Sequence, residues 1–261
     1  MARAALVTAA SRTMPSISPL TNELQTLRSL TNYHAWIFEE LRPFLGAHLV
    51  EIGGGLGAFA AVLAREHILR RGGASLEVFE PDAALFAALN EFLHEQFVPL
   101  MQAGRLRTVQ GEFRSAPQRY DTIILVNVLE HIEDDGRLLD SIYESLTPQG
   151  TLIVYVPALS WLFSPLDRDV GHFRRYDMPR LRRLFESSRF EIVKAIYMDM
   201  AGIVPWYLLN VLCRSRTINP GLARLYDRWG IPVIRALERC TGAPLGKNIL
   251  MIGRKADDRL K

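Results

Sequence analysis

A short apolar segment that runs into a cluster of glycines is the feature that most restricts how this 261-residue chain can fold. Residues 49–57 read Leu-Val-Glu-Ile-Gly-Gly-Gly-Leu-Gly, and a helix-forming sequence follows from Ala58 to Arg65. Glycine adopts backbone angles that other residues avoid and leaves no Cβ atom between the main chain and a ligand. The turn also lies at a helix N-terminus, where partial positive charge collects. The pattern therefore predicts a nucleotide-binding element.

The glycine spacing fits two classes of cofactor. Gly53, Gly55 and Ala58 satisfy G-x-G-x-x-G/A, the dinucleotide fingerprint. Gly53, Gly55 and Gly57 also satisfy G-x-G-x-G, and Glu51 stands two residues upstream. This second form resembles motif I of the class I S-adenosylmethionine (SAM)-dependent methyltransferases. Because a pyrophosphate requires a helix N-terminus free of carboxylates, whereas the cationic groups of SAM tolerate one, Glu51 favours SAM over NAD(P).

An acidic residue at the end of the next strand is expected for either cofactor, because a carboxylate there accepts hydrogen bonds from ribose hydroxyls. Ser75–Phe79 is predicted to form this strand, and Glu80 and Pro81 follow it. Pro81 ends the strand, and Asp82 is predicted to cap a helix over Ala83–Phe97. Glu80 is therefore the predicted ribose ligand, with Pro81 beside it.

A second signature follows the fourth predicted strand. Residues 120–128 form an apolar, β-branched run that suits a central parallel strand covered on both faces. Val128 to Ile132 read V-L-E-H-I and resemble the signature found at this point in many small-molecule methyltransferases. In that family the end of this strand borders the methionine part of SAM, which implies that Asn127, Val128 and His131 bind the cofactor. The alternative for His131 is to cap a helix or bind a backbone group.

The exit of the third predicted strand, Arg105–Gln110, carries Glu112 and Phe113. The resemblance implies an acid and an apolar residue around the adenine at this point, so these two residues are its predicted contacts. Core packing is the alternative for Phe113.

Strands and helices alternate along the chain, which requires right-handed crossovers and a parallel sheet. The resemblance implies an α/β, Rossmann-like fold with a seven-stranded, mostly parallel sheet, helices on both faces, and a last strand inserted antiparallel between strands five and six. An N-terminal helix over Leu20–Leu45 and a helical insertion before the last strand complete the prediction. The remaining predicted elements are helix Arg137–Leu146, strand Thr151–Val156 after a turn at Pro148–Gly150, strand Phe190–Met198 and strand Asn248–Arg254.

We interpret Met1–Pro19 as a flexible tail and residues 20–261 as a single methyltransferase domain. Residues 200–246 are a long insertion with amphipathic, helix-forming stretches, and structureless loops of that length are uncommon in compact domains. Three interpretations remain open for it: a lid over the substrate, a homodimer contact, or a patch that rests on a membrane surface. The lid is favoured because such additions usually determine substrate selectivity in this fold.

The loop after strand five holds the predicted chemistry, because ligands of open α/β sheets bind beyond the carboxyl ends of the strands. From Leu166 to Tyr176 it reads L-D-R-D-V-G-H-F-R-R-Y, which resembles a G-H-x-R-R-Y stretch in a subgroup of small-molecule methyltransferases. His172 is the predicted general base, since imidazole titrates near neutrality, and His131 is the second candidate.

Substrate contacts are predicted from this loop and from the N-terminal helix. Asp167 or Asp169 is expected to orient His172. Asp167 also counts among the predicted substrate-binding residues, and Arg175 or Tyr176 is expected to bind an acidic acceptor. Tyr33 and Trp36 lie in the N-terminal helix, which often covers the cofactor in class I methyltransferases. The alternatives are that the loop residues form structural ion pairs and that Trp36 packs on the sheet.

Composition narrows the function further. The net charge of +3 comes from scattered arginines, a pattern that does not support nucleic-acid binding. Cys213 and Cys240 are the only cysteines, so no metal site is predicted and a reducing cytoplasm is expected. Met200–Cys213 is the most apolar late stretch but is shorter than the roughly 20 residues that span a bilayer, so no transmembrane helix is predicted.

The predicted function is SAM-dependent methylation of a small-molecule acceptor in secondary-metabolite or cofactor biosynthesis. Oxygen and nitrogen acceptors are favoured over carbon because His172 offers a base. One alternative is a methyltransferase-like protein that binds SAM or a protein partner without methyl transfer. The other is an NAD(P)-dependent oxidoreductase, although the Tyr-x-x-x-Lys pair of short-chain dehydrogenases is missing.

Overall fold

The computed structural model describes residues 19–256. The predicted tail Met1–Pro19 lies outside these residues, except for Pro19, which begins the first helix.

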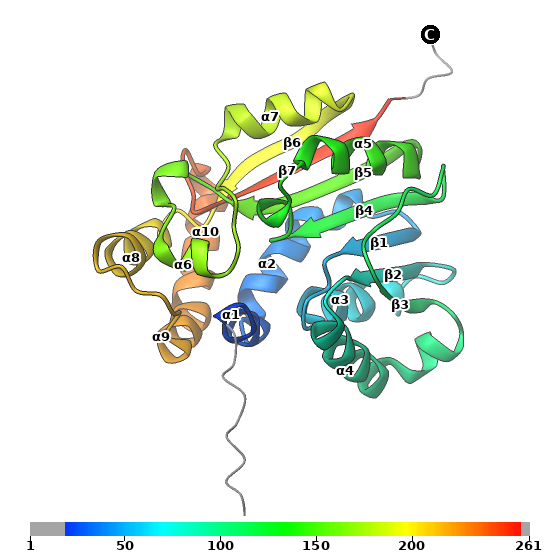
Figure 1. Cartoon of the computed structure of the whole chain (residues 1–261), viewed down its shortest axis with the longest axis horizontal. Helices are drawn as coiled ribbons and strands as arrows, with labels where there is room; N and C mark the ends of the chain where they lie inside the picture. The colour runs from blue at the N-terminus through cyan, green and yellow to red at the C-terminus, as the bar shows by residue number, and fades with distance from the viewer. Residues whose placement is uncertain (1–18, 257–261) are drawn as a thin grey trace, which may run out of the picture.

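The sheet has seven strands in the order β3-β2-β1-β4-β5-β7-β6, which confirms the predicted Rossmann-like fold (Figure 1). β7 pairs antiparallel with both β5 and β6, and the other pairings are parallel. The strand order reverses between β1 and β4, so the carboxyl ends of these strands border the crevice where ligands bind in open sheets. The strands are β1 (His48–Ile52), β2 (Ser75–Glu80), β3 (Leu106–Gln110), β4 (Tyr120–Val126), β5 (Leu146–Pro157), β6 (Phe190–Met198) and β7 (Asn248–Lys255).

Alternating side chains of the strands divide the core into two clusters, one on each face of the sheet. On β4, Ile124 belongs to the cluster that includes α2, α3 and α4, whereas Ile123 and Leu125 belong to the cluster that includes α5 and α7. Figure 1 shows α5 and α7 together on one side of the sheet. The helices are α1 (Pro19–Arg28), α2 (Thr31–Leu41), α3 (Ala58–Leu63), α4 (Ala83–Gln102), α5 (Asp135–Ser145), α6 (Pro165–Asp169), α7 (Met178–Ser187), α8 (Ile203–Trp206), α9 (Pro220–Leu225) and α10 (Ile231–Thr241).

The single helix predicted over Leu20–Leu45 is wrong, because the chain breaks between α1 and α2. Ser29 donates to the carbonyl oxygen of Thr26 twice, from its backbone nitrogen at 3.0 Å and from its hydroxyl at 2.7 Å. Local bonds of this kind compete with the helical hydrogen-bond pattern. α1 therefore ends here and is free to lie at a different angle from α2.

α2 receives its N-terminal cap from a distant part of the chain. The carboxylate of Asp227 accepts hydrogen bonds from the backbone nitrogens of Asn32 at 3.1 Å and Tyr33 at 2.8 Å. The first turn of a helix leaves its N–H groups without partners, and this carboxylate satisfies two of them.

Two strand boundaries also differ from the prediction. β4 ends at Val126 because Asn127 adopts a left-handed conformation with φ of +54°. β5 begins at Leu146, which pairs with Tyr120, and the predicted turn before strand five is a bulge inside β5 before pairing resumes at Thr151.

Residues between β6 and β7 form α8, α9, α10 and two π-helical turns, η5 (Tyr207–Leu212) and η6 (Tyr226–Gly230). From Pro220 to Thr241 the chain is one uninterrupted helical run. Among residues 19–256, every helix is too short or too polar to cross a membrane.

Candidate functional site

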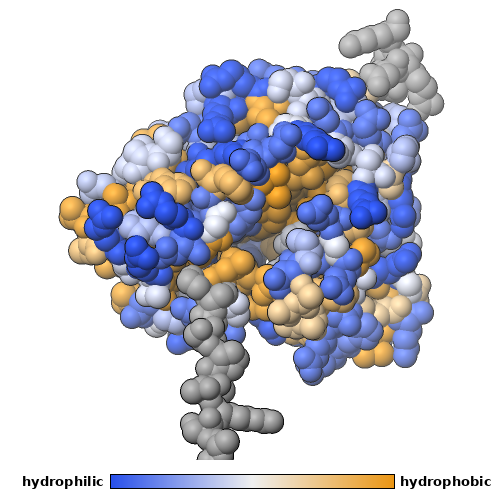
Figure 2. Space-filling model, in the orientation of Figure 1, coloured by the Kyte–Doolittle hydropathy of each residue, from blue (hydrophilic) through white to orange (hydrophobic). Residues whose placement is uncertain are grey.

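Two connected cavities open at the carboxyl ends of the strands. The first, of about 810 Å³, lies over β1, β2 and β4, and the second, of about 450 Å³, lies between α1, β4 and the helices that follow β6. Asn127 and His131 line both cavities. Figure 2 shows this face of the molecule hollowed beside α1, with apolar residues at the base of the hollow.

The glycine turn forms the floor of the first cavity. Gly53 and Gly55 have φ of +73° and +53°, in the region that favours glycine. A Cβ atom on Gly53 would lie 2.6 Å from Cγ2 of Val128, so the two signatures of the sequence are packed against each other. Gly53 and Val128 both line the cavity.

Glu80 joins the glycine turn to the end of β2. Its two carboxylate oxygens accept hydrogen bonds from the backbone nitrogens of Gly55 at 2.8 Å and Asp82 at 3.0 Å. Burial raises the pKa of Glu80, and these two hydrogen bonds partly oppose the rise. Because a carboxylate has about four lone pairs, Glu80 retains acceptor capacity toward the cavity that it lines.

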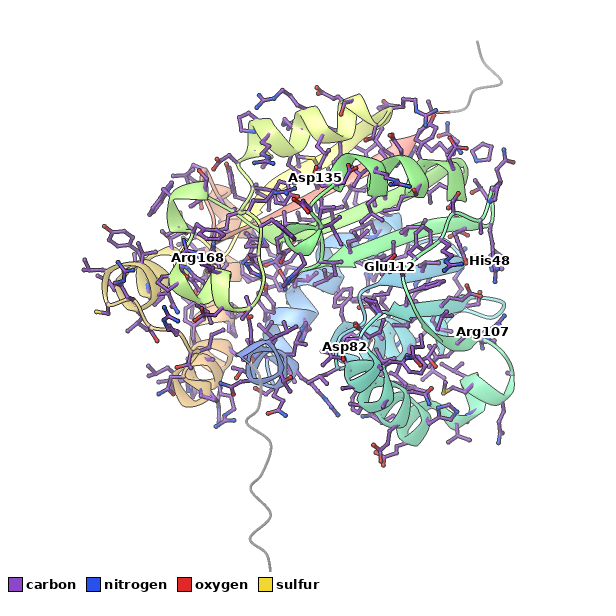
Figure 3. All side chains as sticks on the ribbon, in the orientation of Figure 1. His48, Asp82, Arg107, Glu112, Asp135 and Arg168 are labelled. Atoms are coloured by element: carbon purple, nitrogen blue, oxygen red, sulfur yellow. The ribbon has the colours of Figure 1, made fainter. Side chains whose placement is uncertain are left out.

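The other predicted cofactor residues divide into two groups. Pro81, Glu112, Phe113, Asn127 and Val128 line the first cavity. Phe113 also packs edge-on against Phe79, with ring centroids 5.5 Å apart. Figure 3 shows Glu112 on the loop above the N-terminus of α4, where Asp82 lies.

Glu51 and Gly57, by contrast, line neither cavity. Gly57 precedes α3 with φ of +80° and has Phe92 next to it. Glu51 is only 2% exposed and its Oε2 atom has no hydrogen-bond partner. Burial, with the nearby charge of Glu80, raises the pKa of Glu51 to about 8. The structure thus places both residues behind the cavity wall, at the two ends of the glycine turn.

The lining of the first cavity suits an adenosyl cofactor that carries positive charge. Four carboxylates line it, and only two guanidinium groups, those of Arg114 and Arg137, are present among the lining residues. The excess of acids disfavours a pyrophosphate and favours a sulfonium with an ammonium group. The close approach at Gly53 and Gly55 leaves main-chain atoms open to the ligand.

The second cavity brings together titratable side chains that are far apart in the sequence. The two predicted bases, His172 and His131, line it together with Tyr33 and Arg175. It is also lined by three residues that the sequence analysis missed: Glu23, Glu130 and Lys247. Glu130 belongs to the V-L-E-H-I signature, which could have identified it. Glu23 and Lys247 lie in no motif.

His172 and Asp167 form a hydrogen-bonded pair at this cavity. Nδ1 of His172 lies 2.9 Å from Oδ1 of Asp167. Burial by itself would lower the pKa of His172, but the bond to Asp167 and the charge of Glu130 outweigh burial and raise it. The same bond and the Arg175 guanidinium overcome the effect of burial on Asp167 and hold its pKa at about 2.

Asp167 is fixed by several donors at once. It accepts from Ser164 Oγ at 2.7 Å and from Arg175 Nε at 2.9 Å, and it is completely buried. Ser164 and Asp167 also form the capping box of α6. The short helix therefore holds the carboxylate rigidly behind His172.

The other ring nitrogen of His172 faces Glu130 and His131. Nε2 lies 3.9 Å from Oε1 of Glu130, whose Oε2 is buried without a partner. Burial raises the pKa of Glu130, and burial with the neighbouring His172 lowers that of His131 to about 4, so His131 is a neutral imidazole. Ligand atoms of these three residues lie within 4.8 Å of one another, a spacing at which a metal ion could be held, although the sequence predicts none.

Two cationic groups complete the wall of the second cavity. The guanidinium of Arg175 lies 4.4 Å from the ring centroid of Trp206 while it bonds Asp167. Lys247 Nζ lies 3.1 Å from Oδ2 of Asp199. Each cation is thus paired with a buried carboxylate, and each has further N–H donors that could bind an anionic group of an acceptor.

Three predicted substrate contacts do not line either cavity. Trp36 is buried in the core cluster on α2, and Asp167 lies behind His172 and Arg175. The hydroxyl of Tyr176 donates to Oδ2 of Asp135 at 2.8 Å and is enclosed by the sheet and α5. Packing engages Trp36, and hydrogen bonds inside the protein engage Asp167 and Tyr176, so the structure places all three behind the cavity wall.

Comparisons with known proteins agree with this geometry. A family model described as a methyltransferase domain matches residues 21–195. A curated relative, the mitochondrial ubiquinone biosynthesis O-methyltransferase of Schizosaccharomyces pombe, is 29% identical over 120 residues, which are 45% of this chain and 40% of that protein. The match thus spans about two fifths of the relative.

Solved structures share the fold at low sequence identity. Phosphoethanolamine N-methyltransferase 2 of Haemonchus contortus in complex with SAM superposes with a TM-score of 0.58 at 17% identity, over 87% of this chain and 53% of that one. A protein of Galdieria sulphuraria described as a sarcosine dimethylglycine methyltransferase gives a TM-score of 0.56 at 16% identity, over 86% of each chain.

Proposed function

The chain belongs to the methyltransferase domain family and is a SAM-dependent enzyme, and we propose that it methylates an oxygen or nitrogen atom of a small molecule in the second cavity. When bound, SAM supplies an electrophilic methyl group on a sulfonium that leaves as a neutral sulfide. The protein's part is to position the acceptor, to exclude water and to accept a proton.

We assign the cofactor to the first cavity. Glu80 would accept hydrogen bonds from its ribose, and Phe113 and Glu112 would lie beside its adenine. Asn127 lies at the boundary with the second cavity. The shared residues Asn127 and His131 support this arrangement, because the methyl donor and the acceptor must meet where the two cavities join.

The observation that carries the proposal is the Asp167–His172 pair in the wall of the second cavity. Asp167 holds the Nδ1 hydrogen of His172, so the Nε2 lone pair points away from Asp167 and can take the acceptor's proton. A hydroxyl acceptor would lose this proton to Nε2 as its bond to carbon forms, whereas an ammonium would lose it first, because only the neutral amine has a lone pair that can attack carbon. When His172 takes up the proton, the neighbouring His131 is neutral and adds no second positive charge beside it.

The chemistry of the cavity wall indicates the acceptor's character. Leu27, Leu30, Leu209 and Leu222 line it together with Arg175 and Lys247. An acceptor with an apolar body and an acidic group fits this combination. The relative from S. pombe is named an O-methyltransferase of ubiquinone biosynthesis, which supports oxygen as the acceptor atom and cofactor biosynthesis as the setting. The helices after β6 would then form one wall of the acceptor site.

The first experiment is calorimetric titration of the purified protein with SAM, S-adenosylhomocysteine and NADH. We expect micromolar binding of the two adenosyl ligands and none of NADH. Binding of NADH alone would contradict the proposed cofactor site. A screen of hydroxylated aromatic acids and amines with methyl-labelled SAM then identifies the acceptor, and because no metal is predicted, the activity should persist in EDTA.

Replacing His172→Asn tests the base. Asparagine can still donate to Asp167 but cannot accept a proton at neutral pH, so methyl transfer should fall by roughly 10²-fold or more while SAM affinity is unchanged. His94→Asn, at an exposed position on α4, is the matched control. Full activity of folded His172→Asn with the identified acceptor would remove His172 from the reaction.

A further inference from the structure

The helices between β6 and β7 expose an unusual number of large apolar side chains. Along the helical run from Pro220 to Thr241, five of them recur at intervals of three or four residues, which places them along one side of the helix. Each is 46–65% exposed: Leu222, Leu225, Trp229, Val233 and Leu237. α8 and η5 add Val204, Leu208, Leu209 and Leu212, which are 44–63% exposed. We call these nine residues the apolar set.

Most charged side chains on the same segment are basic. Residues 201–246 contain six arginines and two acids, a net charge of +4 that exceeds the +3 of the whole chain. Both acids are buried and face the rest of the protein: Asp227 caps α2, and Glu238 accepts from the backbone nitrogen of Met200 at 2.7 Å. Arg224, Arg228 and Arg239 are exposed. The charge that residues 201–246 present to solvent is therefore positive.

The apolar set is continuous with the second cavity. Leu209 and Leu222 belong to both, because each is about half exposed and each lines the cavity. Figure 1 shows α8 and α9 at one end of the molecule, and Figure 2 shows hydrophobic and hydrophilic residues side by side there. The mouth of the second cavity thus lies among the apolar residues.

We propose that residues 201–246 dock onto the surface of an anionic lipid bilayer. Exposed Leu, Val and Trp side chains with flanking arginines are typical of helices that lie in the membrane interface, and no helix among residues 19–256 could span the bilayer instead. Each arginine near an anionic surface adds attraction. A second copy of this chain fits less well, because a two-fold contact would bring the arginines of one copy against those of the other.

Docking would place the mouth of the second cavity at the bilayer. An amphiphilic acceptor could then move from the lipid between Leu209 and Leu222 without crossing water. This consequence rests on the proposed function, whereas docking itself is a binding property that can be measured without methyl transfer.

Flotation with lipid vesicles tests the docking. The full chain should float with vesicles of phosphatidylcholine and phosphatidylglycerol and only weakly with pure phosphatidylcholine. Trp229→Glu with Val233→Glu should abolish flotation. The matched control is Leu69→Glu with Val98→Glu, two exposed apolar residues elsewhere on the molecule, and it should float like the unmodified chain. Calorimetric SAM binding should be equal for both double variants, which separates this test from that of the cofactor site.

The arginines give a second readout that does not disturb apolar packing. Arg224→Gln with Arg228→Gln should weaken binding to the anionic vesicles by about tenfold or more, and raising the salt should have a similar effect. Arg182→Gln with Arg183→Gln, on exposed positions of α7, is the charge-matched control and should bind unchanged.

Three outcomes would overturn the proposal. One is a failure of the full chain to bind anionic vesicles. Another is equal loss of binding in the variants and their controls. The third is a stable dimer in sedimentation that disappears with Trp229→Glu and Val233→Glu, which would assign the apolar set to a second copy of the chain.

Discussion

Glu80 and Asp167 are both buried carboxylates, and the hydrogen-bond donors around each carboxylate determine its role. Glu80 accepts from two backbone nitrogens and keeps lone pairs for the first cavity. Asp167 accepts from Ser164, His172 and Arg175, and it lines neither cavity. One acid is therefore available to a ligand, and the other acts through His172.

Replacing Glu80→Ala should weaken SAM binding by about tenfold or more, because two charge-assisted hydrogen bonds to the ribose are lost. Isothermal titration measures the change. Glu91→Ala, at an exposed position on α4, should bind SAM normally. Unchanged affinity in a folded Glu80→Ala protein would exclude the ribose contact.

The pH dependence of methyl transfer should report the state of His172. As a base His172 must be neutral, and its pKa is raised above 6.5, so kcat/KM should increase as the pH rises through that higher value. Asp167→Asn removes the carboxylate that raises this pKa, so the rising limb should move to lower pH and the maximal rate should fall. Glu130→Gln should move the limb in the same direction.

Asp169→Asn, on the same short helix, is the control for the pH profile, because Asp169 pairs with Arg216 at 3.2 Å and has no bond to His172. A profile that stays in place in folded Asp167→Asn and Glu130→Gln would show that His172 is structural rather than the base.

Among the elements, α2 shows that local sequence can predict which residues are helical but not where the helix begins. Its helical residues follow from their periodicity, but its start is determined by Asp227, 195 residues further along the chain. Asp227 in turn lies in η6, so the cap also ties the helices after β6 to the N-terminal helices. Loss of the Asp227 carboxylate should therefore destabilise both the N-terminal helices and the helices after β6.

Asp227→Ala should lower the free energy of unfolding by about 1–3 kcal/mol, because two backbone N–H groups of α2 lose their acceptor. Urea denaturation followed by circular dichroism measures the change. Asp140→Ala, at an exposed position on α5, should change it by no more than about 0.5 kcal/mol. A loss for Asp227→Ala as small as that of the control would contradict the capping role.

Strands and their order could be predicted because the sheet is buried on both faces and its segments are apolar, as residues 120–126 show. Two strand boundaries were predicted wrongly. The end of β4 depends on the backbone conformation of one residue, Asn127, and the start of β5 depends on a bulge after Leu146 that the hydrophobic pattern does not reveal. In the site, motifs indicated His131 and His172, which contact each other with ring centroids 4.6 Å apart. Glu23 and Lys247 could not be found, since only the folded chain brings them to the cavity.

For the molecule as a whole, charge is distributed unevenly. Residues 201–246 carry more positive charge than the entire chain, so the rest of the protein is slightly acidic. The first cavity, with its carboxylates, lies in that acidic part, and the cationic residues of the second cavity lie toward the basic segment. The second cavity also contains two acids, Glu23 and Glu130, so the acidic and basic lining residues are balanced there.

The stability of the whole protein should decrease with pH because of Glu51. Its folded pKa of about 8 lies above the ordinary 4.5, so the folded state holds a proton that the unfolded state releases between these values. This group alone lowers the free energy of unfolding by up to roughly 1.4 kcal/mol per pH unit in that window. Glu51→Gln removes the effect, so its stability advantage over the unmodified chain should grow from pH 5 to about pH 8.

Chemical denaturation at several pH values measures the Glu51 effect, with the exposed Glu91→Gln as control. A constant difference between Glu51→Gln and the unmodified chain across this range would mean that Glu51 is ionised in the folded protein.

The position of β7 has a consequence for synthesis on the ribosome. β7 separates β5 from β6 in the sheet, yet it follows both in the chain, after the whole of residues 199–247. During translation the edges of β5 and β6 must therefore stay open for a time on the order of seconds, while the basic, apolar helices emerge before the strand that completes the sheet. The helices after β6 are therefore synthesised while the sheet still lacks the strand that joins β5 to β6.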